Sequence, residues 1–126
     1  MKSFAIARNR RIKNSRDFAS IYEKRIRAAD GNLLIFAAPN AHHHVRFGVS
    51  VSRKLGPAVR RAALKRLLRE AFRLSQHELP GDLDLILIPQ RANAETAGVA
   101  DYQRSLVKLA TRLARQIGAP HEGPAT

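Results

Sequence analysis

The apolar residues of this chain fall into six segments that show two different periods. In three segments they recur every three or four residues, which is typical of amphipathic helices; these segments are 16–27, 58–77 and 99–117. In the other three they run continuously or alternate with polar residues, which is typical of strands; these segments are 33–38, 45–52 and 84–88. Ser15 is a suitable N-cap for the first helix, and the first two strands are predicted to pair as a hairpin.

The order of these segments predicts helices packed on a small sheet, in an α+β or α/β arrangement. Helix, two strands, helix, strand and helix follow one another, with room for one further short strand. The length of 126 residues predicts a single domain, 1–126. Within it we expect 1–14 to be a flexible basic N-terminus and 118–126 to be a disordered tail.

Positive charge is concentrated in the first part of the chain. Residues 1–73 contain 18 Lys/Arg and 4 Asp/Glu, for a net charge of +14, whereas residues 74–126 carry a net charge of −1. This asymmetry indicates one side that binds a polyanion, and such binding depends strongly on salt because counterions are released. The absence of cysteine excludes disulfides. We find no apolar segment long enough for a membrane span or a signal peptide, so we expect a cytoplasmic protein with no membrane partner.

The predicted 58–77 helix has one cationic arc. At 100° per residue, the cations on this arc are Arg61, Lys65, Arg66, Arg69 and Arg73. The opposite arc is apolar and is predicted to be buried; it consists of Val59, Ala63, Leu64, Leu67, Leu68 and Ala71. Like charges four residues apart repel one another, and no matching row of acids offsets them. The cationic arc therefore predicts a nucleic-acid surface.

Residues 47–72, FGVSVSRKLGPAVRRAALKRLLREAF, resemble the central block of the bacterial ribonuclease P protein component. That block has a strand ending in a Ser-Lys-Lys-like step, a glycine and a basic helix, which here correspond to 52–54, Gly56 and the helix containing 65–70. The segments around Phe18 and Tyr22, LLIFAAPN and DLDLILIP resemble other parts of the family, so the resemblance covers about 13–115. The family's Arg-Asn-Arg falls on 61–63, which here reads Arg-Ala-Ala and so lacks an amide and a guanidinium.

The resemblance implies an α+β fold, a small central β-sheet packed with three helices in the order α-β-β-(β)-α-β-α. It further implies a ribosomal protein S5 domain 2-like topology with a left-handed crossover, although physical preference alone favours a right-handed one. It also implies the protein subunit of ribonuclease P, which binds the catalytic RNA and the 5′ leader of precursor tRNA. In that ribonucleoprotein the RNA holds the catalytic centre and most of the Mg²⁺, and no protein partner is required.

The same resemblance implies two sets of site residues. The RNA-binding residues would be Arg53, Lys54, Arg60, Arg61, Lys65, Arg66, Arg69 and Arg73. The leader-binding cleft would be lined by Phe18, Tyr22 and Phe36, because aromatic rings stack on unpaired bases with little sequence preference. Without the resemblance, Phe18 and Tyr22 would be interpreted as core packing, and Phe36 could equally be buried.

Two other functions and two other sites compete with this interpretation. A structural RNA-binding protein of a ribosome-like particle would also explain the charge, whereas a protein-only nuclease would need an acid or histidine cluster that we do not find. His42, His43 and His44 suggest a metal site, but consecutive loop side chains converge poorly on one ion, so an exposed hairpin loop is expected. Asp82 and Asp84 could form a two-carboxylate site, but a solvated strand start is the expected role.

Overall fold

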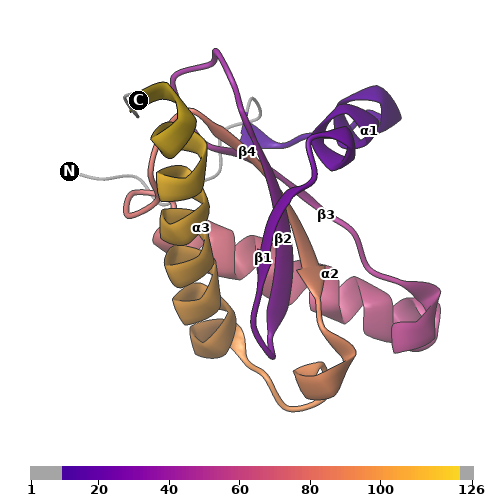
Figure 1. Cartoon of the computed structure of the whole chain (residues 1–126). Coiled ribbons are helices and arrows are strands. Elements are labelled where there is room, and N and C mark those ends of the chain that lie inside the picture. The colour runs from indigo at the N-terminus through magenta and orange to yellow at the C-terminus, as the bar shows by residue number, and fades with distance from the viewer. Residues whose placement is uncertain (1–9, 123–126) are drawn as a thin grey trace.

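The computed structural model describes residues 10–122 of the chain, which form three helices around one sheet (Figure 1). The helices are α1 (Ser15–Glu23), α2 (Ala58–Ser75) and α3 (Val99–Glu122), with two short 3-10 helices, η2 (Arg53–Leu55) and η3 (Arg91–Asn93). The strands are β1 (Ile26–Ala29), β2 (Leu33–Pro39), β3 (Arg46–Val49) and β4 (Leu83–Pro89). The predicted α+β order α-β-β-β-α-β-α is confirmed, including the further short strand.

The sheet has the strand order β1-β2-β4-β3. β2 is antiparallel to both β1 and β4, and β3 is parallel to β4. The predicted hairpin between 33–38 and 45–52 is therefore wrong, because β4 lies between these two strands. Six of the seven β4 residues are buried, and a strand buried on both faces takes a central position. The chain leaves β3, passes through α2 and returns to the neighbouring parallel strand, which makes α2 the crossover helix.

The first helix is shorter than predicted. It ends at Glu23 instead of residue 27, and β1 takes up 26–29. Arg25 has a φ of 58° and so reverses the chain in the left-handed region, a position where glycine is the usual sequence signal. Because Arg25 carries no such signal, the apolar period of the sequence predicts a helix that continues past Ile26. The predicted N-cap is also wrong by one residue, since Asn14 Oδ1 accepts from the backbone N–H of Asp17 at 2.8 Å.

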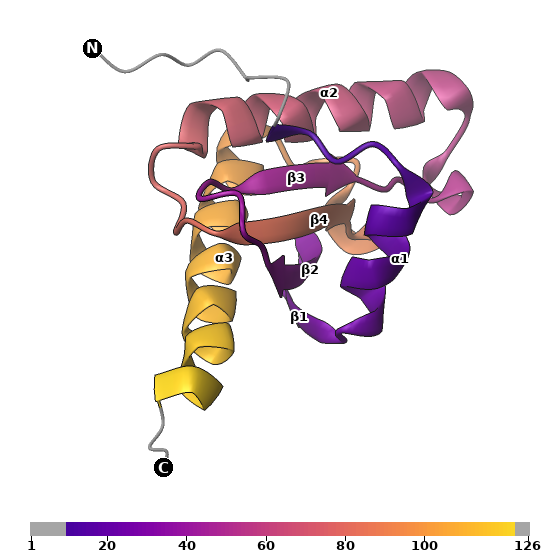
Figure 2. The same cartoon turned by 90° about the horizontal axis from the view of Figure 1, so that it is seen from above.

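Alternating residues of the strands supply two separate apolar layers. One layer contains Leu33, Ile35, Leu85 and Leu87 and packs against α2 and α3, where Phe47 stacks on Phe72 with ring centroids 4.0 Å apart. The other layer lies under α1 and contains Ile12, Ile21, Ala38 and Ile86. Figures 1 and 2 show α1 and α3 on opposite sides of the strands, with α2 running along β3. The sheet face under α1 is covered only in part, and the candidate site lies there.

Both predicted flexible ends contain ordered residues. Ile12 is 5% exposed, its N–H donates to the carbonyl of Phe47 at 2.7 Å, and Arg11 forms a β-bridge with Phe47, so Arg11 and Ile12 lie along the edge of β3. At the other end, α3 continues to Glu122, past the predicted end at residue 117. The remaining residues of the two predicted ends, 1–9 and 123–126, lie outside the described residues. Of the helices that the structure describes, none is long and apolar enough to cross a membrane.

Asp30 holds the turn between β1 and β2 against α3. Its Oδ1 accepts from the N–H groups of Asn32 and Leu33, both at 2.9 Å, and its Oδ2 lies 3.0 Å from Lys108 Nζ. Burial acts to raise the pKa of Asp30, but these hydrogen bonds and the Ser105 hydroxyl together lower it to about 2, from an ordinary value of 3.8. The ionised carboxylate is therefore the form that the folded state favours.

We expect the folded state to lose stability between pH 4 and pH 2 through Asp30. Its pKa is lower in the folded state, so its contribution is complete above 3.8 and disappears as the pH falls through about 2. The loss should be about 2 kcal/mol, because each pKa unit corresponds to about 1.4 kcal/mol. Urea unfolding at pH 2, 4 and 7 would measure it. Asp30→Asn should flatten this dependence, whereas Asp82→Asn, an exposed loop substitution, should leave it unchanged; equal slopes for both variants would contradict the assignment.

Candidate nucleic-acid interface

Three aromatic side chains meet on the sheet face under α1. Phe18 and Tyr22 come from α1 with ring centroids 6.5 Å apart, and Tyr22 meets Phe36 of β2 edge-on at 4.9 Å. All three rings are only partly buried, so part of each ring remains accessible beside the apolar layer of α1. The structure thus brings the three predicted cleft residues together and shows Phe36 on the α1 side of the sheet. The sequence prediction missed Arg27, whose guanidinium lies 5.8 Å above the Phe36 ring.

The register of the sheet explains how this cluster forms. Arg27 pairs with Phe36, Phe36 with Ile86, and Ile86 with Gly48, so these residues form one row across all four strands. Two residues further along, Leu34 pairs with Ile88 on the same face of the sheet, and both side chains are only partly buried. An aromatic cluster, a cation and an open apolar row together form a surface suited to unpaired bases.

Gly48 gives the Phe18 ring its place on the sheet. A Cβ atom at Gly48 would contact Phe18 Cζ and lie 2.9 Å from its Cε1, closer than side chains pack. We expect Gly48→Ala to displace the ring and to lower the free energy of unfolding by about 1–3 kcal/mol, as overpacking does. Urea unfolding would measure the loss of stability. A change in tyrosine fluorescence, to which Tyr22 beside Phe18 contributes, would report the displacement of the ring. Gly81→Ala is the matched control, because nothing lies within 4 Å of its added Cβ; similar losses for both variants would contradict this packing role.

The buried face of α2 is rotated from the predicted one. Its buried residues are Leu64, Leu68, Ala71, Phe72 and Ser75. Val59 and Ala63, which were predicted to be buried, are exposed, and the Val59 side chain is 83% exposed. The helical period is as predicted, but Phe72 falls within the cationic arc, between Arg61 and Lys65, and packs on Phe47. The buried face is therefore turned towards that arc. Val59, Ala62 and Ala63 therefore face solvent.

The cations predicted on α2 divide into groups with different surroundings. Lys65 and Arg69 line a groove of about 160 Å³ together with Arg11 of the N-terminal segment and the backbone of Gly48. Within the part of the chain that the structure describes, none of these three cations forms an ion pair. Unneutralised cations that converge on one groove favour a phosphate group. Arg11 was missed because it falls in the segment that was expected to be flexible.

Other predicted cations on α2 make contacts within the protein. Arg73 binds Glu70 through both carboxylate oxygens, at 2.9 and 2.6 Å. This hydrogen bonding raises the pKa of Arg73 and lowers the pKa of Glu70, so the expectation that no acid offsets the cationic arc is wrong at this end. Arg61 Nε donates to the carbonyl of Gly56 at 3.1 Å and so holds the loop that precedes the helix. Arg66 is exposed.

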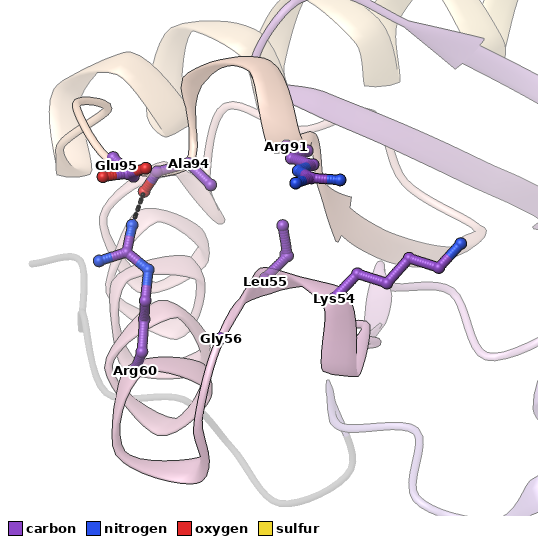
Figure 3. A pocket seen from close by; sticks show the side chains of 7 residues that line it. All are labelled: Lys54, Leu55, Gly56, Arg60, Arg91, Ala94 and Glu95. Carbon is purple, nitrogen blue, oxygen red and sulfur yellow. Dashed lines mark hydrogen bonds between the residues drawn. The ribbon is translucent and has the colours of Figure 1, made fainter.

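Arg60 lies on a different side of α2 and lines a pocket of about 290 Å³ (Figure 3). Its Nη2 donates to the carbonyl of Ala94 at 3.2 Å, which ties α2 to the segment after β4. Gly56 has a φ of 130° and its missing Cβ leaves room for the Arg60 side chain. Lys54 and Arg91 also line this pocket, and Figure 3 shows both extending away from Arg60. Arg53 and Lys54, which are predicted to bind RNA, are exposed. Arg91 lies in the same pocket as Lys54, and only the fold could reveal this.

Asp84 is a buried partner of Arg46 and does not form the solvated strand start that was expected. Its Oδ1 accepts from Arg46 Nε and from Asn40 Nδ2, both at 2.8 Å, and its Oδ2 accepts from Arg46 Nη2 at 2.7 Å. Asp82 lies outside β4, with a φ of 65°, so the two carboxylates do not share a strand face. The described residues contain no group of three His, Asp or Glu side chains that could hold a metal ion.

The histidines occupy the connection from β2 to β3, where His42 and His43 are exposed. This loop is not the predicted hairpin, because its two strands flank β4. The rings of His42 and His44 lie 5.9 Å apart, and His43 Nδ1 lies 3.9 Å from Asp82 Oδ1. The His43–Asp82 contact lies at the surface, since both side chains are largely exposed.

Comparisons with known proteins agree with one another. The family model for ribonuclease P matches residues 6–114. The ribonuclease P protein component of Desulfovibrio desulfuricans is 36% identical over 122 residues, which cover 93% of this chain and 92% of that relative. The solved structure of the RNase P protein from Thermotoga maritima has a TM-score of 0.74 at 28% identity, covering 81% of this chain and 96% of that one. The Staphylococcus aureus RNase P protein has a TM-score of 0.70 at 33% identity, covering 84% and 95%.

Proposed function

This chain belongs to the ribonuclease P protein family, and we propose that it binds the catalytic RNA and the 5′ leader of precursor tRNA to promote endonucleolytic removal of the leader. The observation that carries the proposal is the presence of two distinct surfaces beside β3, one aromatic and one cationic. One is the aromatic cluster under α1, and the other is the cationic groove between β3 and α2. A protein that joins a structured RNA to an unpaired strand needs both.

The aromatic cluster is the proposed leader site. Phe18, Tyr22 and Phe36 offer ring faces to unpaired bases, and stacking tolerates the sequence differences expected between leaders. Arg27 lies above Phe36, where it can contact the backbone of a bound strand. The tilted and edge-on ring contacts fix the positions of the rings before RNA binds, which lowers the entropy cost of binding.

The cationic residues are the proposed site for the catalytic RNA. Lys65 and Arg69 converge with Arg11 on one groove, and Arg66 extends the row on the exposed side of α2. Arg53 and Lys54 continue the positive surface before α2. Arg60, Arg61 and Arg73 hold the loops and the helix through their contacts with Ala94, Gly56 and Glu70. We propose that these three position the surface as well as adding to its charge.

The protein residues do not fit a catalytic Mg²⁺ site, since the described part of the chain has no cluster of three acids or histidines and Asp84 is engaged by Arg46. We therefore propose that the RNA holds the Mg²⁺ and the reacting groups. We also propose that the ribonucleoprotein acts in the cytoplasm and needs no further protein partner. The protein would reduce the Mg²⁺ requirement by placing cations against closely packed phosphates.

Cleavage of precursor tRNA by the cognate catalytic RNA tests this function. We expect the protein to stimulate cleavage at low Mg²⁺, and we expect Lys65→Glu/Arg69→Glu to abolish the stimulation at moderate salt. Arg112→Glu/Arg115→Glu is a control with the same charge change, at two exposed residues of α3 that do not line the groove. A lack of stimulation by the unsubstituted protein would refute the proposal, and cleavage by the protein without RNA would favour a protein-only nuclease.

A further inference from the structure

An apolar groove lies on α2 beside the proposed RNA-binding cations. It has a volume of about 410 Å³ and is lined by Ala63, Arg66, Leu67, Glu70 and Val99. Ala62 and Val59 are exposed on the same helix. Alanine occupies position 63, where the family resemblance implies an arginine, so the groove here is lined by a short apolar side chain at this position. An exposed apolar groove within a cationic surface is unusual and indicates a ligand with both flat apolar and charged parts.

The lining of the groove matches the chemistry of a nucleobase. Leu67 and Val99 provide apolar contacts from α2 and from the first turn of α3. Arg66 is exposed at the rim, and guanidinium planes stack on unpaired bases. The Glu70 carboxylate binds Arg73 with both oxygens but keeps further lone pairs, which can accept the N–H groups on the edge of a base.

The position of the groove favours RNA over a protein segment as the occupant. Arg66 lines the groove and also belongs to the same cationic arc as Lys65 and Arg69, so a polyanion lying along these residues passes the rim of the groove. The phosphate contacts and the base contact would then be made by one strand. A base can enter the groove only where it is unpaired, because the bases of a duplex are stacked inside it.

We propose that this groove binds one unpaired nucleobase of the catalytic RNA, with a preference for bases that offer an amino group to Glu70. The proposal rests on the proposed function, since it requires that the catalytic RNA covers α2. It assigns to Ala63 and its neighbours a base contact in place of the polar contacts that an asparagine and an arginine would make.

Chemical footprinting of the holoenzyme tests the proposal. A reagent for the Watson–Crick edges of unpaired bases reports base contacts, and hydroxyl-radical cleavage reports backbone contacts. With the unsubstituted protein we expect at least one unpaired base of the catalytic RNA to be protected. Ala63→Trp should fill the groove, restore the reactivity of that base and weaken RNA binding about tenfold, while the backbone protection remains. Ala63 is exposed, so the variant should fold, and circular dichroism would verify this.

Ala19→Trp is the matched control, because Ala19 is an exposed helical alanine on α1, on the opposite side of the sheet. It should leave the protected base unchanged. Removing the same base from the RNA should weaken binding of the unsubstituted protein about tenfold and should not weaken binding of Ala63→Trp further. The losses of affinity from the protein substitution and from removal of the base would then report the same contact between the protein and the RNA.

The outcomes separate the two proposals. Backbone protection without any base whose reactivity depends on residue 63 would overturn the base site and leave the proposed function standing. No protection of the catalytic RNA at all would overturn the proposed function itself. If the free protein sediments as a dimer that Ala63→Trp dissociates, the occupant of the groove is a second copy of the chain, and the base site is also overturned.

Discussion

Replacing Asp84 with alanine is expected to lower the free energy of unfolding by about 3–5 kcal/mol. The side chains of Arg46 and Asp84 are 16% and 10% exposed, and two parallel hydrogen bonds join them. Removing the carboxylate leaves the Arg46 guanidinium buried without a counter-charge and removes an acceptor of Asn40. Since small domains are stable by only about 5–15 kcal/mol, this substitution should bring the protein close to unfolding. Urea unfolding monitored by circular dichroism would measure the change.

Two control variants distinguish the lost pair from a general effect of substitution. Asp82→Asn, at a carboxylate that is 60% exposed, should change stability by less than about 0.5 kcal/mol. Arg46→Met/Asp84→Leu should be close to neutral or stabilising, because well-packed apolar residues often replace a buried ion pair without loss. If the double variant is as unstable as Asp84→Ala, the pair itself stabilises the fold and the unpaired-charge explanation is wrong.

Phe18→Ala should abolish the gain in precursor tRNA affinity that a 5′ leader provides. Phe18 packs on the buried Gly48 and lies beside Tyr22, and its ring stays partly exposed, so a base can stack on the exposed part. Stacking of one base contributes about 1–3 kcal/mol, so we expect the holoenzyme to lose about tenfold or more in affinity for a substrate with a long leader. Affinity for a substrate with no leader should be unchanged. Fluorescent precursor tRNAs that differ only in leader length would measure both values.

Phe18→Tyr is the matched variant, because it keeps the aromatic face and should keep the gain. Both variants must first be shown to fold, since Phe18 also contacts the layer that contains Ile12 and Ile86. If leader length has no effect with the unsubstituted protein while RNA binding persists, the chain acts as a structural RNA-binding protein and the leader site is wrong. If the leader increases the affinity of the Phe18→Ala holoenzyme as much as that of the unsubstituted one, the Phe18 ring does not bind the leader, although Tyr22 and Phe36 still could.

The strand that the sequence prediction missed shows why local patterns fall short at turns. Ile26 continues the helical spacing of the apolar residues in α1 and also fits the start of a strand. The apolar pattern therefore cannot decide whether Ile26 belongs to a helix or to a strand. The decision is made by Arg25 in the left-handed conformation and by the pairing of Ile26 with Ala37 across β1 and β2. The same pairing places Arg27 over Phe36, a contact that no helical assignment could predict.

The sequence by itself determined the strongly cationic α2, the chemistry of the aromatic residues and the types of all the α-helices and strands except β1. These follow from hydrophobic period and residue type, which are local properties of the chain. The tertiary structure decided which strand is central, how α2 is rotated and which cations remain unpaired. Glu70 neutralises Arg73, whereas Lys65 and Arg69 meet Arg11 beside β3. The Glu70–Arg73 pair is local, since the two residues are three apart on one helix. The meeting of Arg11 with Lys65 and Arg69 joins residues far apart in the chain, so it exists only once the sheet has set the order of its strands.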